Sequence, residues 1–150
     1  MNQTLTGKDG IQIDSRVLSD LADGDAVTLS YPNDLGMAKA GKNGNIIYAV
    51  NENGRICEVT LRVTLGSSDD KYLNSRLQEF KADAAKFILL TGVFAKRVGA
   101  GDGNVNSVIY ECTGGVFKKQ IEAKSSAEGD VAQSVVVYTI TFGAGNRSIQ

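Results

Sequence analysis

Strand-like patterns of hydrophobic and polar residues occupy much of this chain. The clearest alternating segments are 25–31, 55–65, 105–113 and 131–142, and 11–13 is a shorter one. Segments 45–51 and 86–98 are also strand-like but contain continuous apolar stretches, and 116–123 is a further short strand. Alternation with a period of two residues is typical of strands that bury one face. The pattern predicts a mainly β (α+β) chain of about seven strands. Strands in hairpin order favour an antiparallel β-sandwich or barrel.

One segment, residues 68–84, follows a helical period instead. Its apolar side chains recur three or four residues apart: Leu73, Leu77, Phe80 and Ala84. Ser67 or Ser68 can cap the start of this helix. A single apolar stripe suits a helix that packs on one sheet face, so we expect one flanking helix. Residues 16–21 also show helical spacing, which suggests one short turn.

Turn signals separate these elements. Asn51-Glu52-Asn53-Gly54 lies between strands 45–51 and 55–65, and Asn-Gly favours a tight hairpin, so we expect those two strands to pair. Residues 99–104 (GAGDGN) predict another hairpin loop. Gly114-Gly115 predicts a break, and residues 125–130 predict a loop.

Three polar, glycine-containing segments have no evident role within the fold. They are an N-terminal arm (residues 1–10), an irregular loop that begins at Pro32 (residues 32–45) and a C-terminal tail (residues 143–150). A long structureless loop in a compact domain is uncommon and often functional. The chain of 150 residues is otherwise expected to form a single domain.

The composition argues against catalysis. The chain has no histidine, which removes the commonest general base and metal ligand and rules out Ser-His or Cys-His pairs within it. Cys57 and Cys112 have no metal-ligand spacing, and each lies in a strand-like segment, which favours a buried, reduced thiol. A disulfide between them would require neighbouring strands. We expect no enzyme activity and no cofactor.

Other candidate chemistry is weak. The loop 99–104 lacks the Lys-Ser/Thr ending of a phosphate loop and the ligand spacing of a calcium loop. Asp69-Asp70 and Glu79 with Asp83 fit a helix start and a solvated helix face. Scattered basic pairs lack the aromatic interleaving that binds single-stranded nucleic acid, and the tyrosines and phenylalanines are expected in the core: Tyr48, Tyr110, Tyr138, Phe117 and Phe142.

Charge and hydropathy limit the partners. The net charge of −1 gives no reason to expect specific nucleic-acid binding, and it opposes self-association only weakly. We expect no signal peptide and no membrane anchor, because the N-terminus is polar and no apolar segment approaches the roughly 20 residues of a membrane span. The chain is expected to be made and kept in a reducing cytoplasm.

Six parts of the chain follow one another in a recognisable order. They are a polar arm, a strand ending at Tyr31-Pro32, DLGMAKAGKNGN, IIYAVNENGRICEVTLRVTLGSSDD, DKYLNSRLQEF and a closing strand ending TITFGAG. This order of elements resembles the tube proteins of contractile phage tails. In that family, which shares its fold with secretion-system tube proteins, six copies form a ring. Strands of all six join into an inner barrel, and stacked rings form a hollow tube that conducts DNA inside a sheath.

The resemblance implies a structural virion protein of the tail that assembles with itself. Its further partners would be the tail sheath protein, tape-measure or baseplate and terminator proteins, and passing DNA that it does not bind specifically. Candidate subunit contacts are Leu5, Asp34, Leu35, Met37, Lys39, Lys42, Asn43 and Arg147. The alternatives are another tail or baseplate component of the same fold and a small β-sandwich carbohydrate-binding module. The lack of tryptophan disfavours the carbohydrate module, and the lack of histidine makes a small hydrolase a distant option.

Overall fold

The computed structural model describes residues 2–5, 10–22, 26–123 and 134–150. Within these residues, nine strands form one antiparallel sheet in the order β3-β2-β8-β9-β11-β7-β4, with β1 beside β8 and β10 beside β11. Two further strands, β5 and β6, form a separate hairpin. The strands are β1 (Thr4–Leu5), β2 (Gly10–Ile13), β3 (Arg16–Val17), β4 (Val27–Ser30), β5 (Gly36–Ala40), β6 (Ile46–Val50), β7 (Cys57–Thr64), β8 (Leu90–Gly99), β9 (Val105–Phe117), β10 (Glu122–Ala123) and β11 (Val135–Ile149). The helical elements are the 3₁₀ turns η1 (Lys42–Gly44) and η2 (Glu52–Arg55) and the helix α1 (Ser68–Ala82).

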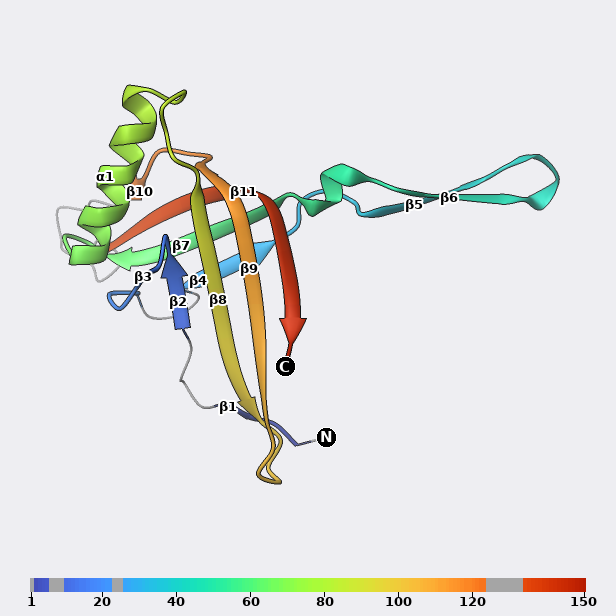
Figure 1. Cartoon of the computed structure of the whole chain (residues 1–150), viewed down its shortest axis with the longest axis horizontal. Coiled ribbons are helices and arrows are strands. Elements are labelled where there is room, and N and C mark those ends of the chain that lie inside the picture. Colours follow the sequence, from blue (N-terminus) through green and yellow to red (C-terminus); the bar gives the residue numbers. More distant parts are fainter. Residues whose placement is uncertain (1, 6–9, 23–25, 124–133) are drawn as a thin grey trace.

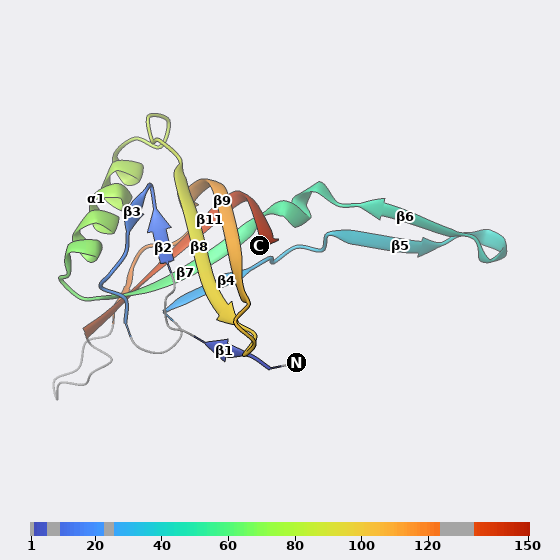
Figure 2. The ribbon, with the colours of Figure 1, turned by 60° about the horizontal axis from the view of Figure 1, so that its bottom comes forward.

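The molecule has three parts, which Figures 1 and 2 show from two directions. The body holds α1 and the sheet strands around it. The apron is the part of the sheet that extends below the body, namely residues 95–99 of β8, 105–111 of β9 and 144–149 of β11, with β1 at its edge. The arm, residues 36–50, projects from the body as a long hairpin. The prediction of a mainly β fold with one flanking helix is confirmed.

Alternation along β7 and β11 builds the core of the body. Their inward side chains are almost fully buried: Cys57, Val59, Leu61 and Val63 on β7, and Val136, Tyr138, Ile140 and Phe142 on β11. The two strands pair directly, with Tyr138 opposite Leu61. Tyr110 packs half-buried against this core, and Phe117 is buried within it. These four aromatic residues therefore lie in or against the core, as predicted.

The helix α1 covers the open face of this sheet through Leu73 and Leu77, which are buried. Ser67 caps it as one of the two predicted candidates, because its Oγ accepts a hydrogen bond from the N–H of Asp70 at 3.2 Å. The helix ends two residues earlier than predicted, at Ala82. Asp83 has left helical geometry, with φ of −156°, and donates its N–H back to Glu79. Ala84 consequently lies outside the helix and is exposed.

The predicted helical turn over residues 16–21 is wrong. Arg16–Val17 forms β3, and the chain then follows the edge of β7, where Leu21 forms a bridge with Val63. Asp69, 1% exposed, anchors this segment by accepting hydrogen bonds from the N–H groups of Ser19 (2.7 Å) and Asp20 (2.8 Å). Its other carboxylate oxygen lies 3.3 Å from Nε of Arg16. A tertiary contact with α1 thus overrides the local spacing.

The predicted hairpin at Asn53-Gly54 is also wrong. Residues 52–55 form the turn η2, β6 pairs with β5, and β7 pairs with β11 and β4. The side chain of Asn51 accepts a hydrogen bond from the N–H of Asn53, which closes an Asx turn instead of a two-residue hairpin. The chain therefore changes direction between β6 and β7 without pairing them.

Residues 32–45, predicted as an irregular loop, contain β5 and the turn η1. The register of β5 and β6 runs from Gly36 opposite Val50 to Ala40 opposite Ile46. The chain reverses at Asn43 (φ 67°) and Gly44 (φ 80°), both in the left-handed region that Asn-Gly adopts readily. The hairpin signal is thus used at Asn43-Gly44, and Tyr48, predicted in the core, is 75% exposed on the arm.

The remaining corrections concern strand ends. The tail 143–150 is not a free polar end, because β11 continues to Ile149 and pairs with β9. Gly114-Gly115 does not divide two strands but lies inside β9, where Gly114 has φ of 69°. The strand predicted over 86–98 begins at Leu90, and β1 places part of the N-terminal arm on β8. Residues 6–9, the predicted loop 125–130 and the predicted strand start 131–133 lie outside the described residues.

Candidate assembly surface

The arm exposes apolar side chains on both of its faces. Cross-strand partners share a face, so Ala38 with Tyr48 and Ala40 with Ile46 lie on one side, here called face A, together with Val50. The opposite side, face B, carries Met37 with Ala49 and Lys39 with Ile47. Every residue of β5 and β6 is exposed. Small side chains on β5 facing large ones on β6 give face A a stepped apolar surface.

An isolated two-stranded hairpin is at best marginally stable in water. This arm has neither a third strand nor a helix over it among the described residues, and it stands away from the body in both views (Figures 1 and 2). Contiguous exposed apolar side chains of this kind mark interaction sites. We therefore take the arm as the main candidate surface for a partner.

The base of the arm is held firmly on the body. The N–H of Asn51 donates to the carbonyl oxygen of Leu35 at 2.7 Å, which joins the segments before β5 and after β6 where the arm begins. Gly54 is buried under this crossing, and a Cβ there would lie 2.5 Å from the Cα of Leu35. Asn33 adds a side-chain hydrogen bond to the carbonyl oxygen of Asn53 at 3.2 Å. The direction of the arm is therefore fixed by backbone packing at its base.

The second candidate surface is the edge of β11 in the apron. Ser107 and Gln150 exchange both backbone hydrogen bonds, at 2.8 and 2.9 Å. Since bonding alternates along an antiparallel strand, Gly145, Arg147 and Ile149 direct their N–H and C=O groups away from β9. The pairing of β11 with β7 ends at Phe142 opposite Cys57. In the described part of the chain, this lower edge of β11 has no strand beside it.

A hollow of about 420 Å³ adjoins this free edge. It lies between η2 and the β9–β11 pair and is lined by Arg55, Glu111, Thr113, Ala144, Gly145 and Asn146. Arg55 also forms an exposed ion pair with Glu52 at 3.2 Å. The hollow thus lies where the arm base and the apron meet, over one face of the β9–β11 pair.

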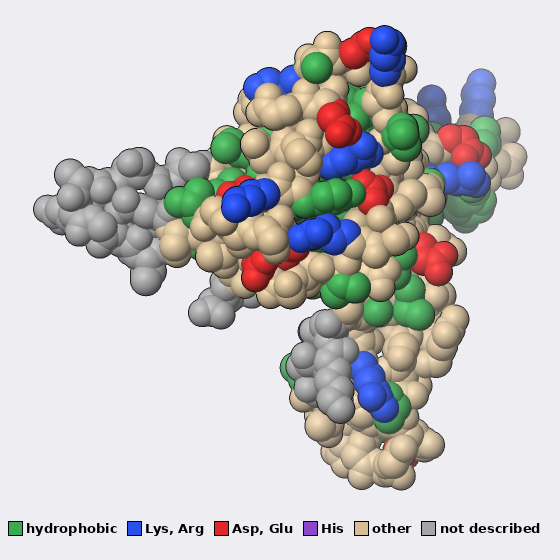
Figure 3. Space-filling view, turned by 60° about the vertical axis from the view of Figure 1, so that its left-hand side comes forward, with side chains coloured by type: hydrophobic (Ala, Val, Ile, Leu, Met, Phe, Trp, Pro, Cys, Tyr) green, Lys and Arg blue, Asp and Glu red, His purple; other side chains and the backbone are tan. Residues whose placement is uncertain are grey.

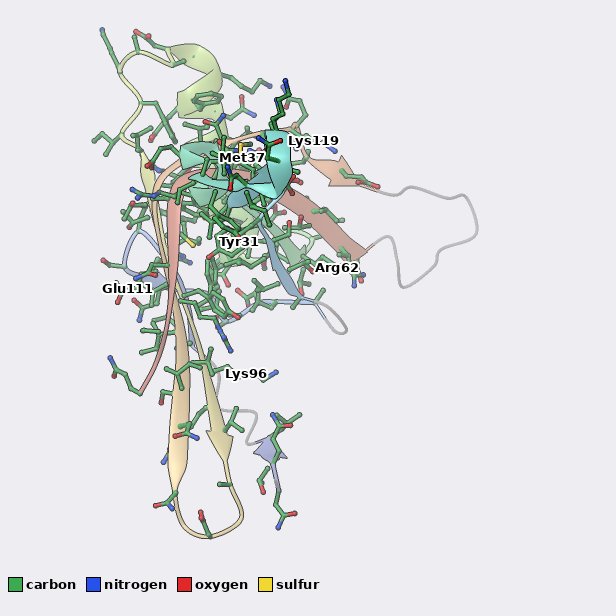
Figure 4. The ribbon with its side chains drawn as sticks, turned by 90° about the vertical axis from the view of Figure 1, so that its right-hand side faces the viewer. Tyr31, Met37, Arg62, Lys96, Glu111 and Lys119 are labelled. Carbon is green, nitrogen blue, oxygen red and sulfur yellow. The ribbon has the colours of Figure 1, made fainter. Side chains whose placement is uncertain are left out.

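The opposite edge of the apron is β1. Thr4 and Leu5 pair with Gly99 and Val98 of β8, and both are exposed. The two faces of the apron differ: Lys96 and Glu111 point to opposite sides of it (Figure 4). Arg147 stacks on Tyr110 at 5.9 Å. The apron is therefore a four-stranded sheet, β1-β8-β9-β11, with one unpaired edge on each side within the described residues.

The structure places the predicted contact residues on these two surfaces. Met37, Lys39, Lys42 and Asn43 lie on the arm, and Asp34 and Leu35 lie at its base. Leu5 and Arg147 lie on opposite edges of the apron, on β1 and β11. All eight are exposed.

Sequence reasoning missed the apolar residues of β6, because a continuous apolar stretch such as Ile46–Val50 is typical of a buried strand. A signal was available in Asn43-Gly44, whose hairpin tendency equals that of Asn53-Gly54. The backbone edge at Gly145 and Ile149 has no sequence signal, because it depends on where β7 turns away from β11.

A packed contact links the arm base to β11. A Cβ on Gly145 would lie 2.9 Å from the Cβ of Cys57 and 3.3 Å from the hydroxyl of Tyr31, so glycine is required there. Burial raises the pKa of the Tyr31 phenol, and the nearby Cys57 adds to this effect. Cys57 and Cys112 are buried free thiols, as predicted. The pKa of the Cys112 thiol is raised mainly by its hydrogen bond with Cys57 and, to a smaller extent, by its burial.

The weak chemical candidates have structural roles. Asp102 closes the β8–β9 hairpin by accepting hydrogen bonds from the backbone and side chain of Asn104, which lower the pKa of its carboxyl. The carboxylate of Asp70 accepts a hydrogen bond from the hydroxyl group of Tyr138 at 2.6 Å. On the α1 side of the body, charges of both signs are interspersed (Figure 3).

No helix within the described ranges has the length and apolar character needed to cross a membrane. No protein-family model matches the chain, and no curated protein matches it.

Proposed function

We propose that this protein is a structural subunit that assembles with copies of itself into the tube of a phage tail. The observation that carries the proposal is the arm: a hairpin that exposes apolar side chains on both faces and has its direction fixed at its base. A hairpin apolar on both sides needs cover on both sides. Two surfaces of neighbouring copies supply such cover more readily than one small ligand.

The apron supplies the lateral contact in this proposal. The free edge of β11 on one copy pairs with the β1 edge of the next, as in β-strand addition. Because the two edges differ, the contact is head-to-tail, and such contacts form a ring when the rotation closes. The resemblance to tail tube proteins implies six copies in that ring.

The arm supplies the contact between rings. It projects beyond β11, on the side of the free strand edge, as Figures 1 and 2 show, and in this proposal it reaches past the laterally paired copy to the next ring. It docks on the adjacent ring, with faces A and B each covered by a subunit. The resulting tube conducts DNA without binding it specifically, within a tail sheath in the virion.

The test is electron microscopy of the purified protein and of a variant without the arm. Leu35 and Asn51 are hydrogen-bonded at 2.7 Å, so a two-residue Asn-Gly link in place of residues 36–50 closes the chain without disturbing the body. We expect stacked hollow rings or tubes from the full chain. The shortened variant is expected to remain folded, by circular dichroism, and to form no tubes.

A full-length protein that stays monomeric at high concentration, in low and high salt, would contradict the proposal. So would an armless variant that forms normal tubes. That second result would leave the lateral contact standing and would remove the arm from the assembly.

A further inference from the structure

The chain holds two Asn-Gly pairs near the arm, in very different surroundings. Asn43-Gly44 forms its tip, and Asn53-Gly54 lies at its base. Asn-Gly is chemically labile in any protein, because glycine leaves its backbone nitrogen accessible to the asparagine side chain. Whether the reaction occurs in the folded state depends on whether the backbone can rotate to bring the two groups together.

The tip leaves that rotation free. Residues 42–44 are all exposed, and a Cβ added to Gly44 would meet no atom within 4 Å. The tip is held by the short turn η1 and by the bond from the N–H of Gly41 to the carbonyl oxygen of Asn45. Hairpin ends of this kind open locally at little free-energy cost.

The base prevents the same rotation. Gly54 is buried, with a Cβ position 2.8 Å from the carbonyl oxygen of Asp34, and its N–H donates to the carbonyl oxygen of Asn51 at 3.0 Å. Asn53 is held through its N–H by Asn51 and through its carbonyl oxygen by Asn33. Turning the Asn53–Gly54 peptide would require the arm to separate from the body.

We infer that Asn43 is a site of spontaneous deamidation in the folded subunit and that Asn53 is protected. The backbone nitrogen of Gly44 attacks the side-chain amide carbon of Asn43, a C–N bond forms, and ammonia leaves with the transferred proton. Water then opens the resulting succinimide. It cleaves either of the two C–N bonds and yields aspartate or isoaspartate at position 43. No oxidant, enzyme or metal is required.

The product changes the charge and the geometry of the arm tip. Residues 36–50 carry two lysines and no acidic residue, so the new carboxylate halves their net positive charge. Isoaspartate also lengthens the backbone in a turn where Asn43 has φ of 67° and Gly44 has φ of 80°, which alters the register set by the turn. Resting on the proposed function, we expect modified subunits to stack poorly and assembled subunits to be protected.

The chain provides an internal control for the chemical test. Cleavage after Lys42 and Arg55 yields one tryptic peptide, residues 43–55, that contains both Asn-Gly pairs. The variant Arg147→Pro keeps the arm but is expected not to assemble, because the proline lies on the free edge of β11. Its subunits are incubated at mildly alkaline pH and sampled over time. Fragment-ion mass spectrometry then locates the amide-to-acid mass gain at position 43 or 53. The same series in concentrated urea gives the intrinsic rate of each site.

We expect conversion at Asn43 at least tenfold faster than at Asn53 in the folded protein, and similar conversion at both sites in urea. An Asn43→Gln variant should lose the fast conversion, because a longer side chain closes the ring slowly. Equal rates at the two sites in the folded protein, or an Asn43 that stays intact while the unfolded chain is converted, would overturn the inference.

A second measurement separates this inference from the proposed function. Conversion at Asn43 is compared between unassembled subunits and purified tubes. Fast conversion in subunits with none in tubes supports both the site and the docking of the arm. Fast conversion in both leaves the deamidation site standing and contradicts the burial of the tip on assembly.

Discussion

The apolar residues on face A of the arm offer the sharpest test of its role. We consider the triple variant Ile46→Thr, Tyr48→Thr and Val50→Thr. Threonine keeps the strand tendency of β6 while shortening Ile46 and Tyr48 and placing a hydroxyl group in each apolar contact. None of the three side chains belongs to the hydrophobic core of the body, so the thermal unfolding midpoint of the subunit should change little.

The size of the expected effect follows from exposure. The three side chains are 54%, 75% and 68% exposed in the free subunit. Complete burial of a large apolar side chain is worth about 1.5–3 kcal/mol, so covering the exposed part of each contributes about 1–2 kcal/mol. The three together then contribute about 3–6 kcal/mol. Since about 1.4 kcal/mol is a factor of ten, the triple variant should weaken assembly by about 100-fold or more.

The assay is the critical protein concentration for tube formation, measured by light scattering and sedimentation. Leu65→Thr is the matched control, because Leu65 is 55% exposed just after β7 and lies outside the arm. We expect this control to assemble like the parent. If the triple variant keeps the parental critical concentration and unfolding midpoint, face A contributes no contact energy and the reasoning from its exposure is wrong.

Three further predictions concern the apron and the body. Arg147→Pro removes an N–H that points away from β9, so it should abolish lateral assembly while the subunit stays folded. Asn146→Pro removes a hydrogen bond to β9, so it should lower the unfolding midpoint of the subunit itself. Equal unfolding midpoints for the two variants would contradict the alternating direction of the hydrogen-bonding groups along β11. Asp69→Ala removes the buried acceptor that the N–H groups of Ser19 and Asp20 share. It should lower the free energy of unfolding by about 3 kcal/mol in urea titrations, against less than about 1 kcal/mol for the exposed Glu79→Ala. Equal losses would refute the anchoring role. Burial and a hydrogen bond to a carboxylate raise the pKa of Tyr138 above its usual 10.0, so the unfolded chain loses this proton first, and stability should fall as pH rises above about 10. In Tyr138→Phe this dependence should be weaker, and an unchanged pH profile would contradict the assignment.

The local sequence pattern was sufficient to predict those elements whose tertiary contacts match their own hydrophobic pattern. The stripe of Leu73 and Leu77 and the cap at Ser67 predict α1, because helix capping and amphipathicity act within a few residues. The alternation of β7 predicts its buried face for the same reason. The predicted hairpin failed because two Asn-Gly pairs compete, and local tendency does not decide which of them β6 uses.

The candidate site was predictable in part. That the segment around Met37 and Lys39 has no packing role within the subunit was predictable, and its residues are indeed exposed. Its structure and the exposure of Tyr48 were not, because a continuously apolar strand has the same pattern whether its cover comes from the same chain or from a partner. The free edge near Gly145 depends on long-range pairing, which no local pattern encodes.

The two surfaces differ in a way that predicts an order of assembly. The edge of β11 is preformed, because β9 holds it in register along its whole length. The arm is fixed at its base, but two strands alone stabilise a hairpin poorly, so its docking also orders the arm itself. Lateral pairing therefore needs no ordering step, whereas stacking does, and rings should form before tubes. On this argument Arg147→Pro blocks both rings and tubes, while the face A variant still forms single rings. If subunits of either variant joined along the tube axis without first closing into rings, the arm, not the strand edge, would drive the first contact.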